Sequence, residues 1–236
     1  MMTEQDLIWA VSIDIGKKNF AFYIEEFDRG ELLCLENIPK NERYNPNGTT
    51  TPKMEELLKR IYRNGRTILY KNSDLTENCA KGSYLDPETY HNMNELLDKH
   101  RYYFDRCSYF VIEMQMSFRG KLNTMAMKLG QHCYSYFTFM YSRFKTIIEF
   151  PAYHKTHVLG AEKIEKRTKK GNVTYRCIDK PARKLYSIVK AKEIFKERSD
   201  KESLDILTNA RKADDLGDVV CQLASWKYLM FVNKSI

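Results

Sequence analysis

Residues 7–16 of the chain read LIWAVSIDIG, an apolar run that contains one carboxylate, Asp14, and stops at Gly16. A short apolar run that ends at a glycine is typical of a buried β-strand. A carboxylate is costly to bury without a partner, so Asp14 needs a compensating group nearby. The run therefore predicts a buried strand with a compensated carboxylate at its end.

Two more short apolar runs follow at 19–27 and 31–38, with a turn at 28–30 between them, and the three runs predict a three-stranded meander. The remaining expected elements are, in chain order, a loop at 39–52, polar helices near 53–64 and 86–101 with an irregular connection, a central strand at 108–114, a long helix at 122–143, a strand at 146–150, and helices at 181–198 and 213–231. Strands interrupted by helices in this order predict an α/β fold.

A second carboxylate, Glu113, ends the apolar run SYFVIEM. Asp215 and Asp218 are spaced i, i+3 at the start of the last expected helix, so they share one face and lie at its positive end. Four such carboxylates form a set of oxygen ligands for a hard divalent cation. Taken singly, Asp14 is also consistent with a strand end in a turn, and Asp215 or Asp218 with an ordinary helix start.

The chain has 39 basic and 31 acidic side chains, a formal net charge of +8, and residues 151–236 contain 19 basic against 11 acidic groups. The densest basic segment surrounds Gly171 and contains Lys163, Lys166, Arg167, Lys169 and Lys170. A localised basic segment attracts polyanions, and nucleic acid is the usual partner. The alternative interpretation is a solvated hairpin tip.

Other function classes find little support in the sequence. No apolar run approaches the roughly 20 residues of a membrane helix, and the N-terminal residues lack the features of a signal peptide. The six cysteines form no C-x-x-C pair and are expected to be free thiols. We therefore expect one intracellular domain that is not secreted and has no membrane partner.

Three motifs resemble those of the RuvC-like Holliday junction resolvases of the RNase H-like superfamily, most closely the poxvirus-type enzymes of large cytoplasmic DNA viruses and their mitochondrial relatives. The motifs are SIDIGKKNFA at 12–21, IEMQ at 112–115 leading to NTMAMKLGQ at 123–131, and KADDLGD at 212–218. They occur in the order of the family and span nearly the whole chain.

The resemblance implies a single RNase H-like nuclease domain over 1–236, with a five-stranded mixed sheet flanked by helices. It also implies a homodimer that cuts four-way DNA junctions by paired symmetric nicks, without any small-molecule cofactor besides the metal. For a viral protein, the expected location is the cytoplasm of the infected cell. The chain departs from compact members by insertions near 39–105 and 160–178.

By motif position, the metal ligands would be Asp14, Glu113, Asp215 and Asp218, and the role of Asp214 relative to Asp215 stays open. Two Mg²⁺ ions, or Mn²⁺ in their place, about 4 Å apart would activate water and stabilise the leaving oxygen. The family also places a lysine before the last acidic pair, and Lys184 matches that position, with Lys155 as the competitor. Such a lysine would neutralise charge in the transition state.

The expected DNA contacts are Phe118, Arg119, Asn123, Lys155, Lys166, Arg167, Lys169 and Lys170. Phe118 is a candidate wedge between bases, although an aromatic side chain beside a helix start also fits the core. The aromatic stripe of Tyr134, Phe137, Tyr141 and Phe144 fits a core or dimer contact better than a base-stacking surface.

Two other functions are consistent with part of the sequence. The motif IDIGKKN also resembles the first phosphate loop of actin/Hsp70-type ATPases, but 236 residues without a second such strand are too few for their two lobes. A branched-DNA-binding protein without catalytic activity would keep the basic surface and lose the metal site, whereas all four acidic positions are occupied here.

Overall fold

The computed structural model describes residues 6–115, 123–168 and 171–236. Its centre is a five-stranded sheet in the order β3-β2-β1-β4-β5, in which β1, β2 and β3 are antiparallel and β1, β4 and β5 are parallel. The strands are β1 Leu7–Asp14, β2 Phe20–Asp28, β3 Arg66–Ser73, β4 Cys107–Met114 and β5 Thr146–Pro151. The predicted five-stranded mixed sheet flanked by helices is confirmed.

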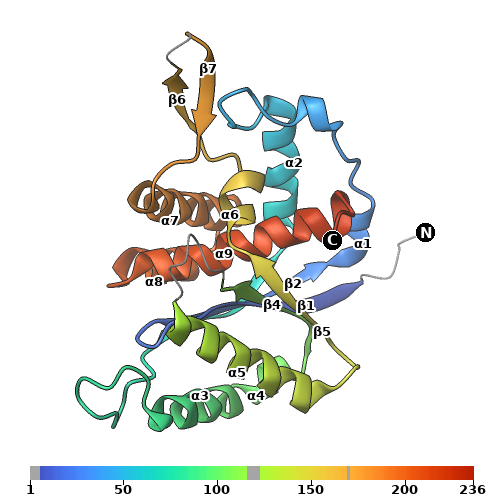
Figure 1. Cartoon of the computed structure of the whole chain (residues 1–236). Helices are drawn as coiled ribbons and strands as arrows, with labels where there is room; N and C mark the ends of the chain where they lie inside the picture. The colour runs from blue at the N-terminus through green and yellow to red at the C-terminus, as the bar shows by residue number, and fades with distance from the viewer. Residues whose placement is uncertain (1–5, 116–122, 169–170) are drawn as a thin grey trace.

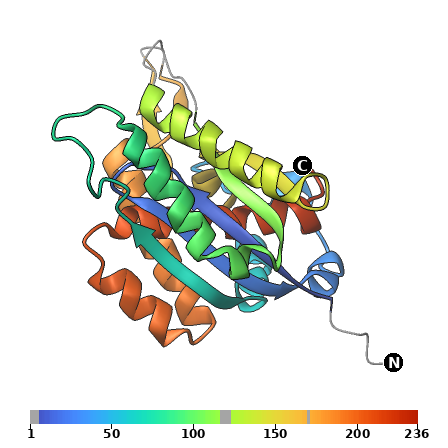
Figure 2. The same cartoon turned by 90° about the horizontal axis from the view of Figure 1, so that it is seen from below.

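Helices cover both faces of the sheet, which lies between two helical layers in Figure 1 and is seen from below in Figure 2. The helices are α1 Arg29–Leu33, α2 Pro52–Arg63, α3 Pro87–Lys99, α4 Arg101–Phe104, α5 Thr124–Tyr141, α6 Tyr153–Val158, α7 Lys180–Glu197, α8 Lys201–Asn209 and α9 Ala213–Lys227, with a 3-10 turn at Lys40–Glu42 and a π turn at Tyr228–Val232. One apolar cluster joins α2, α7 and α9 to the sheet, and a second joins α3, α4 and α5 to the other face. None of the helices within the described ranges is long and apolar enough to cross a membrane.

Helix α9 is packed most tightly against the sheet, and two residues explain its position. A Cβ atom at Gly217 would lie only 3.0 Å from the backbone of Ser187, so glycine permits the close crossing of α9 and α7. The buried amide Nε2 of Gln222 lies 3.1 Å from Ser12 Oγ and 2.9 Å from Val111 O. These bonds fix α9 beneath the carboxyl-terminal halves of β1 and β4.

The prediction of a third strand at 31–38 was wrong, because this run begins as helix α1 and continues as a loop. Asp28 caps α1 by accepting a hydrogen bond of 3.0 Å from the backbone N–H of Glu31. Leu32 and Leu35 are buried at i, i+3 spacing, which fits one side of a helical turn. The third strand of the antiparallel part is instead β3, which occupies the connection expected to be irregular.

The basic segment forms a two-stranded hairpin, β6 Ile164–Arg167 and β7 Val173–Arg176. All eight strand residues are exposed, and the hairpin projects from the layer that contains α6 and α7 (Figure 1). It therefore lies on the same side of the sheet as α9 (Figure 1).

Candidate active site

Asp14 and Glu113 end the two central strands. The parallel pairing of β1 and β4 places Ile13 beside Ile112. The next residues of the two strands, Asp14 and Glu113, are therefore neighbours as well. Each lies on the sheet face that α9 covers, because their strand neighbours Ile13 and Ile112 belong to the opposite apolar cluster. After Asp14 the chain turns tightly at Gly16, where a Cβ atom would lie 2.6 Å from Asn19 O.

The first turns of α9 bring Asp218 to this pair of strand ends. Asp218 shares a small cleft of about 170 Å³ with Glu113, at the junction of β4 with α6 and α7. Asp214 and Asp215 lie in the first turn of the same helix, where the positive end of the helix favours negative charge. The structure thus brings together three of the four predicted carboxylates, while Asp215 lies beside Asp214 at the edge of the group.

Lys155 lies between the carboxylates. It comes from α6, the short helix that follows β5, and its ammonium Nζ is 3.3 Å from Glu113 Oε1 and 3.1 Å from Asp218 Oδ2. The residue is only 5% exposed. Burial disfavours the charged form, but Glu113, Asp218 and Asp14 together raise the pKa of Lys155, so it is held as a cation.

Burial and the neighbouring charges both shift the pKa values of the clustered carboxylates. Burial and the nearby Glu113 carboxylate raise the pKa of Asp14 well above its usual range. Burial acts on Glu113 in the same direction, but Lys155 and a hydrogen bond with Asp14 outweigh it and lower its pKa. Asp14 and Glu113 are therefore in hydrogen-bond contact and have pKa shifts of opposite direction.

Lys184, the lysine that the family resemblance favoured, pairs with Asp214. This hydrogen bond raises the pKa of Lys184 and, against the effect of burial, lowers that of Asp214. Burial and the neighbouring Asp214 raise the pKa of Asp215 to about 6. The structure thus places Lys155 inside the cluster formed by Asp14, Glu113 and Asp218, and Lys184 at the edge of that cluster.

The donor set fits a divalent cation in its chemistry. Asp14, Glu113 and Asp218 contribute three carboxylates against one ammonium group, and the negative charge of Glu113 adds to burial in raising the pKa of Asp14. Within the described ranges, no three His, Cys, Asp or Glu side chains are arranged to hold a metal ion. In this structure the carboxylates are instead drawn around Lys155.

The predicted DNA contacts have different positions. Phe118, Arg119, Lys169 and Lys170 lie outside the described residues. Asn123 is exposed and caps α5 by accepting a 3.3 Å bond from the N–H of Ala126. Lys166 and Arg167 are exposed on β6.

The aromatic stripe is divided. Phe137 and Tyr141 lie in the core, and Tyr134 packs against it. Phe144 follows the end of α5 and is 93% exposed. Of the two predicted roles, core or dimer contact, the core role therefore does not apply to Phe144, because the chain leaves the helix at Ser142, where φ is 49°.

Some residues of the site were not singled out in the sequence. Lys180 and Arg183, in the first turns of α7, line the same small cleft as Glu113 and Lys155. Gln222 links α9 to both central strands, and a polar residue in an otherwise apolar stretch of that helix was its only sequence signal.

Comparison with known proteins gives relatives in viruses and a shared fold. The chain is 32% identical to the uncharacterized protein 170L of Invertebrate iridescent virus 6 over 96% of this chain and 92% of the relative. It is 28% identical to the uncharacterized protein 97L of Invertebrate iridescent virus 3 over 92% and 98% of the two chains. No protein-family profile matches the chain.

Among solved structures, the fowlpox virus Holliday junction resolvase superposes with a TM-score of 0.50 at 16% identity, over 94% of this chain and 99% of the resolvase. The RuvC-like resolvase fold that the motifs indicated is therefore confirmed.

Proposed function

We propose that this chain, which belongs to the family of protein 170L of Invertebrate iridescent virus 6, is a metal-dependent endonuclease that resolves four-way DNA junctions by paired symmetric nicks. One observation carries the proposal: Asp14 and Glu113 end adjacent parallel strands and meet Asp218 and Lys155. The fold shared with a Holliday junction resolvase supports the choice of substrate. Because the curated relatives are viral, the proposed place of action is the infected cell.

In this proposal Asp14, Glu113 and Asp218 hold Mg²⁺ or Mn²⁺, with Asp215 completing a second ion site. When bound, the ions supply an activated water and stabilise the leaving oxygen. Lys155 offers its ammonium group to the charge that develops on the attacked phosphate. The cations of α7 that line the cleft, Lys180, Arg183 and Lys184, bind the adjoining DNA backbone. Lys166 and Arg167 of the hairpin add phosphate contacts farther from the cut.

The test is a nicking assay on a synthetic four-way junction with each strand labelled in turn. We expect cuts at symmetric positions in opposing strands with Mg²⁺ or Mn²⁺, and no cuts with EDTA or on a linear duplex of the same sequence. Absence of cutting with both metals, by protein that binds the junction, would overturn the proposed activity.

A second candidate function is junction binding without cutting. The observation that favours it is the position of Lys155, which already neutralises two of the carboxylates. The same nicking assay separates the two functions, because a binding-only protein shifts the junction in a gel but leaves every strand intact.

The two lysines are expected to differ in importance. Lys155→Ala should slow single-turnover cutting by about 10²-fold or more, the usual cost of removing one donor that stabilises transition-state charge. Lys184→Ala should have a smaller effect, because Lys184 pairs with Asp214 and is partly exposed. Lys196→Ala, at an exposed position of α7, is the matched control. Equal cutting rates for folded Lys155→Ala and the control would contradict this role of Lys155 and favour Lys184 as the lysine that stabilises the attacked phosphate.

We further propose a homodimer, because symmetric resolution requires two matched nicks and the described residues contain one cluster of carboxylates, around Asp14 and Glu113. Helix α5 offers apolar area for the interface, since Phe139 is 87% exposed and Phe144, just beyond the helix, is 93% exposed. Sedimentation at micromolar concentration should give the mass of two chains, and Phe139→Asp should weaken the dimer. A monomeric mass together with full resolving activity would contradict this proposal.

A further inference from the structure

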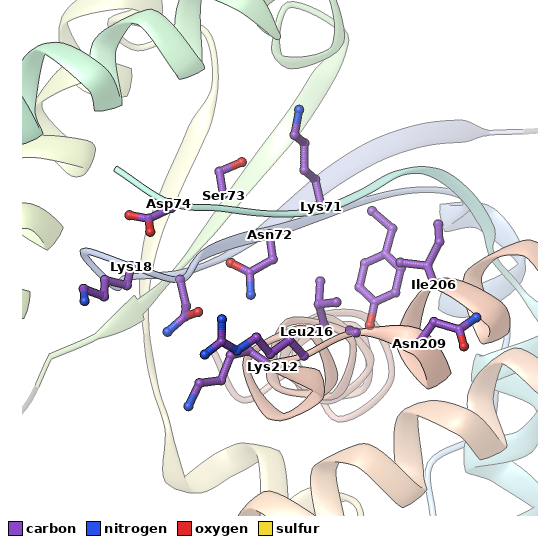
Figure 3. Close-up of a pocket in the computed structure, with 13 residues that line it drawn as sticks. Lys18, Lys71, Asn72, Ser73, Asp74, Ile206, Asn209, Lys212 and Leu216 are labelled. Carbon is purple, nitrogen blue, oxygen red and sulfur yellow. The ribbon is translucent and has the colours of Figure 1, made fainter. Parts of the chain in front are cut away.

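A polar groove of about 760 Å³ lies beside the carboxylate group, between the edge strand β3 and the connection from α8 to α9 (Figure 3). The β1–β2 turn contributes Lys18 to its wall, and the connection contributes Arg211 and Lys212. None of the sequence motifs discussed above pointed to this groove as a binding site.

Its cations are available for a ligand. Lys18, Arg211 and Lys212 are exposed, and no carboxylate of the described residues forms an ion pair with any of them. The one acidic residue of the wall, Asp74, is engaged by Thr76, whose backbone N–H and hydroxyl donate to it at 2.8 and 2.6 Å. The groove therefore has a net positive charge, although Lys212 also interacts electrostatically with Asp214 and Asp215.

Among the residues of the same wall, Tyr70, Asn72 and Ser73 each have a buried polar atom without a partner in the described part of the chain, and Ser73 extends to the other side of the strand (Figure 3). The hydroxyl of Tyr70, a residue only 7% exposed, and Oδ1 of Asn72 are buried without a hydrogen bond to any described residue. In Figure 3 Asn72 extends from β3 toward Lys212, whereas Lys71 and Ser73 extend to the other side of the strand. Since buried polar groups are normally satisfied, these two groups indicate a ligand with hydrogen-bonding atoms.

Residues of the groove lie close in sequence to the carboxylates, after β1 and before α9. Lys18 follows Asp14 by four residues, and Lys212 precedes Asp214 by two. On α9, Leu216 lines the groove while Asp218 lines the small cleft of α7, about 200° apart around the helix. In the sheet, β3 is two positions from β1, or roughly 10 Å. The groove and the cleft thus lie on opposite sides of the carboxylates.

We propose that this groove binds the sugar–phosphate backbone of the cut DNA strand, about two to three nucleotides from the scissile phosphate and on the side away from α7. The spacing follows from the strand separation, because a DNA strand advances about 3.4 Å per nucleotide along the helix axis. Three cations suit successive phosphates, and the Tyr70 hydroxyl is a neutral donor to a phosphate oxygen. The inference rests on the proposed function and adds the path of the substrate.

The first experiment measures junction affinity in EDTA at several salt concentrations for a triple variant, Lys18→Ala, Arg211→Ala and Lys212→Ala. Each lost phosphate contact removes about 0.9 from the log–log salt slope, so the slope should fall by roughly 2 to 3. The control removes the same charge at the exposed Lys40, Lys99 and Lys196 and should keep the wild-type slope.

Tyr70→Phe gives an independent readout. Because the hydroxyl has no partner in the protein, its removal should leave the unfolding midpoint unchanged. Junction affinity should fall by roughly two- to tenfold, the value of one hydrogen bond.

The second experiment locates the contact with junctions that contain one neutral methylphosphonate linkage at successive positions around the cut. Wild-type protein should lose affinity when the neutral linkage is two or three nucleotides from the cut on one side. The triple variant should lose no further affinity there.

The outcomes separate the two proposals. Failure of the wild-type chain to bind and cut junctions would overturn the proposed function. The proposal that the groove binds DNA would be overturned by either of two results, provided that the wild type binds and cuts normally. One is an unchanged salt slope in the triple variant, and the other is an equal methylphosphonate effect in both proteins.

Discussion

Asp14→Asn is expected to slow junction cutting by at least about 10²–10³-fold, the cost of removing a principal charge-stabilising group, while junction binding persists. The amide has nearly the shape of the carboxylate but lacks the charge that would hold a divalent ion. The basic groups that bind the DNA backbone are not changed. Single-turnover nicking with Mg²⁺ and a gel-shift titration in EDTA measure the two effects separately.

The same substitution should not destabilise the protein. Burial raises the pKa of Asp14, and the nearby carboxylates of Glu113 and Asp218 raise it further. Removing the acid therefore relieves an unfavourable burial, so the free energy of unfolding should stay equal or rise. Lower activity with equal or greater stability is the signature of a residue kept for function.

Glu113→Gln and Asp218→Asn should also abolish cutting, and Asp205→Asn, at an exposed position of α8, is the control that should not. Near-normal nicking by any two of the three site variants would contradict the assignment.

The carboxylates were predictable because they leave a local signal. An acidic residue at the end of an apolar strand is rare, because burying its charge is costly without a compensating partner. Asp14 and Glu113 both show this pattern. Lys155 has no such signal. It lies in the six-residue helix YHKTHV, which has no apolar periodicity, and its burial results from the approach of α6 to α9.

Strand partners were harder to predict than strand positions. The run at 31–38 is apolar enough for a strand, but the Asp28 cap and the i, i+3 spacing of Leu32 and Leu35 suit a helical turn equally well. Besides β1, the strand that pairs with β2 is β3, about 40 residues farther along the chain. Pairing at that separation depends on tertiary contacts that no local pattern encodes.

Glu25 shows that an acidic residue within an apolar strand can also belong to a structural ion pair. Like Asp14, it is an acid within an apolar strand, yet it lies far from the carboxylate group in a fully buried ionic cluster. Its Oε2 is 2.9 Å from Nη1 of Arg198, and its Oε1 accepts a hydrogen bond from Lys227. The three residues are 1%, 4% and 0% exposed on their side chains. Only the structure separates the acid that binds two cations from those that we propose bind a metal.

Glu25→Gln is expected to lower the free energy of unfolding by about 3–5 kcal/mol, because it leaves two buried cations without a counter-charge. Lys227→Met should cost less, about 1–3 kcal/mol, since the Arg198–Glu25 pair remains and the main loss is the donor to two carbonyls. Those carbonyls belong to Ile61 and Asn64, at 3.1 and 2.6 Å from Lys227 Nζ. Urea unfolding followed by tryptophan fluorescence measures both changes. Equal costs for the two variants would contradict a cluster in which one anion serves two cations.

The pH dependence gives this prediction a second check. Burial acts to raise the pKa of Glu25, but Arg198 and Lys227 outweigh it, and the net pKa lies below the ordinary value of 4.5. A lowered folded-state pKa contributes stability that is fully present above 4.5 and is lost as the pH falls through the folded-state value. The difference in stability between wild type and Glu25→Gln should therefore shrink in acid, as Glu25 becomes protonated in the folded protein. A difference that grows as the pH falls toward 4.5 and levels off below it would mean that Glu25 is buried neutral, with its pKa raised above the ordinary value.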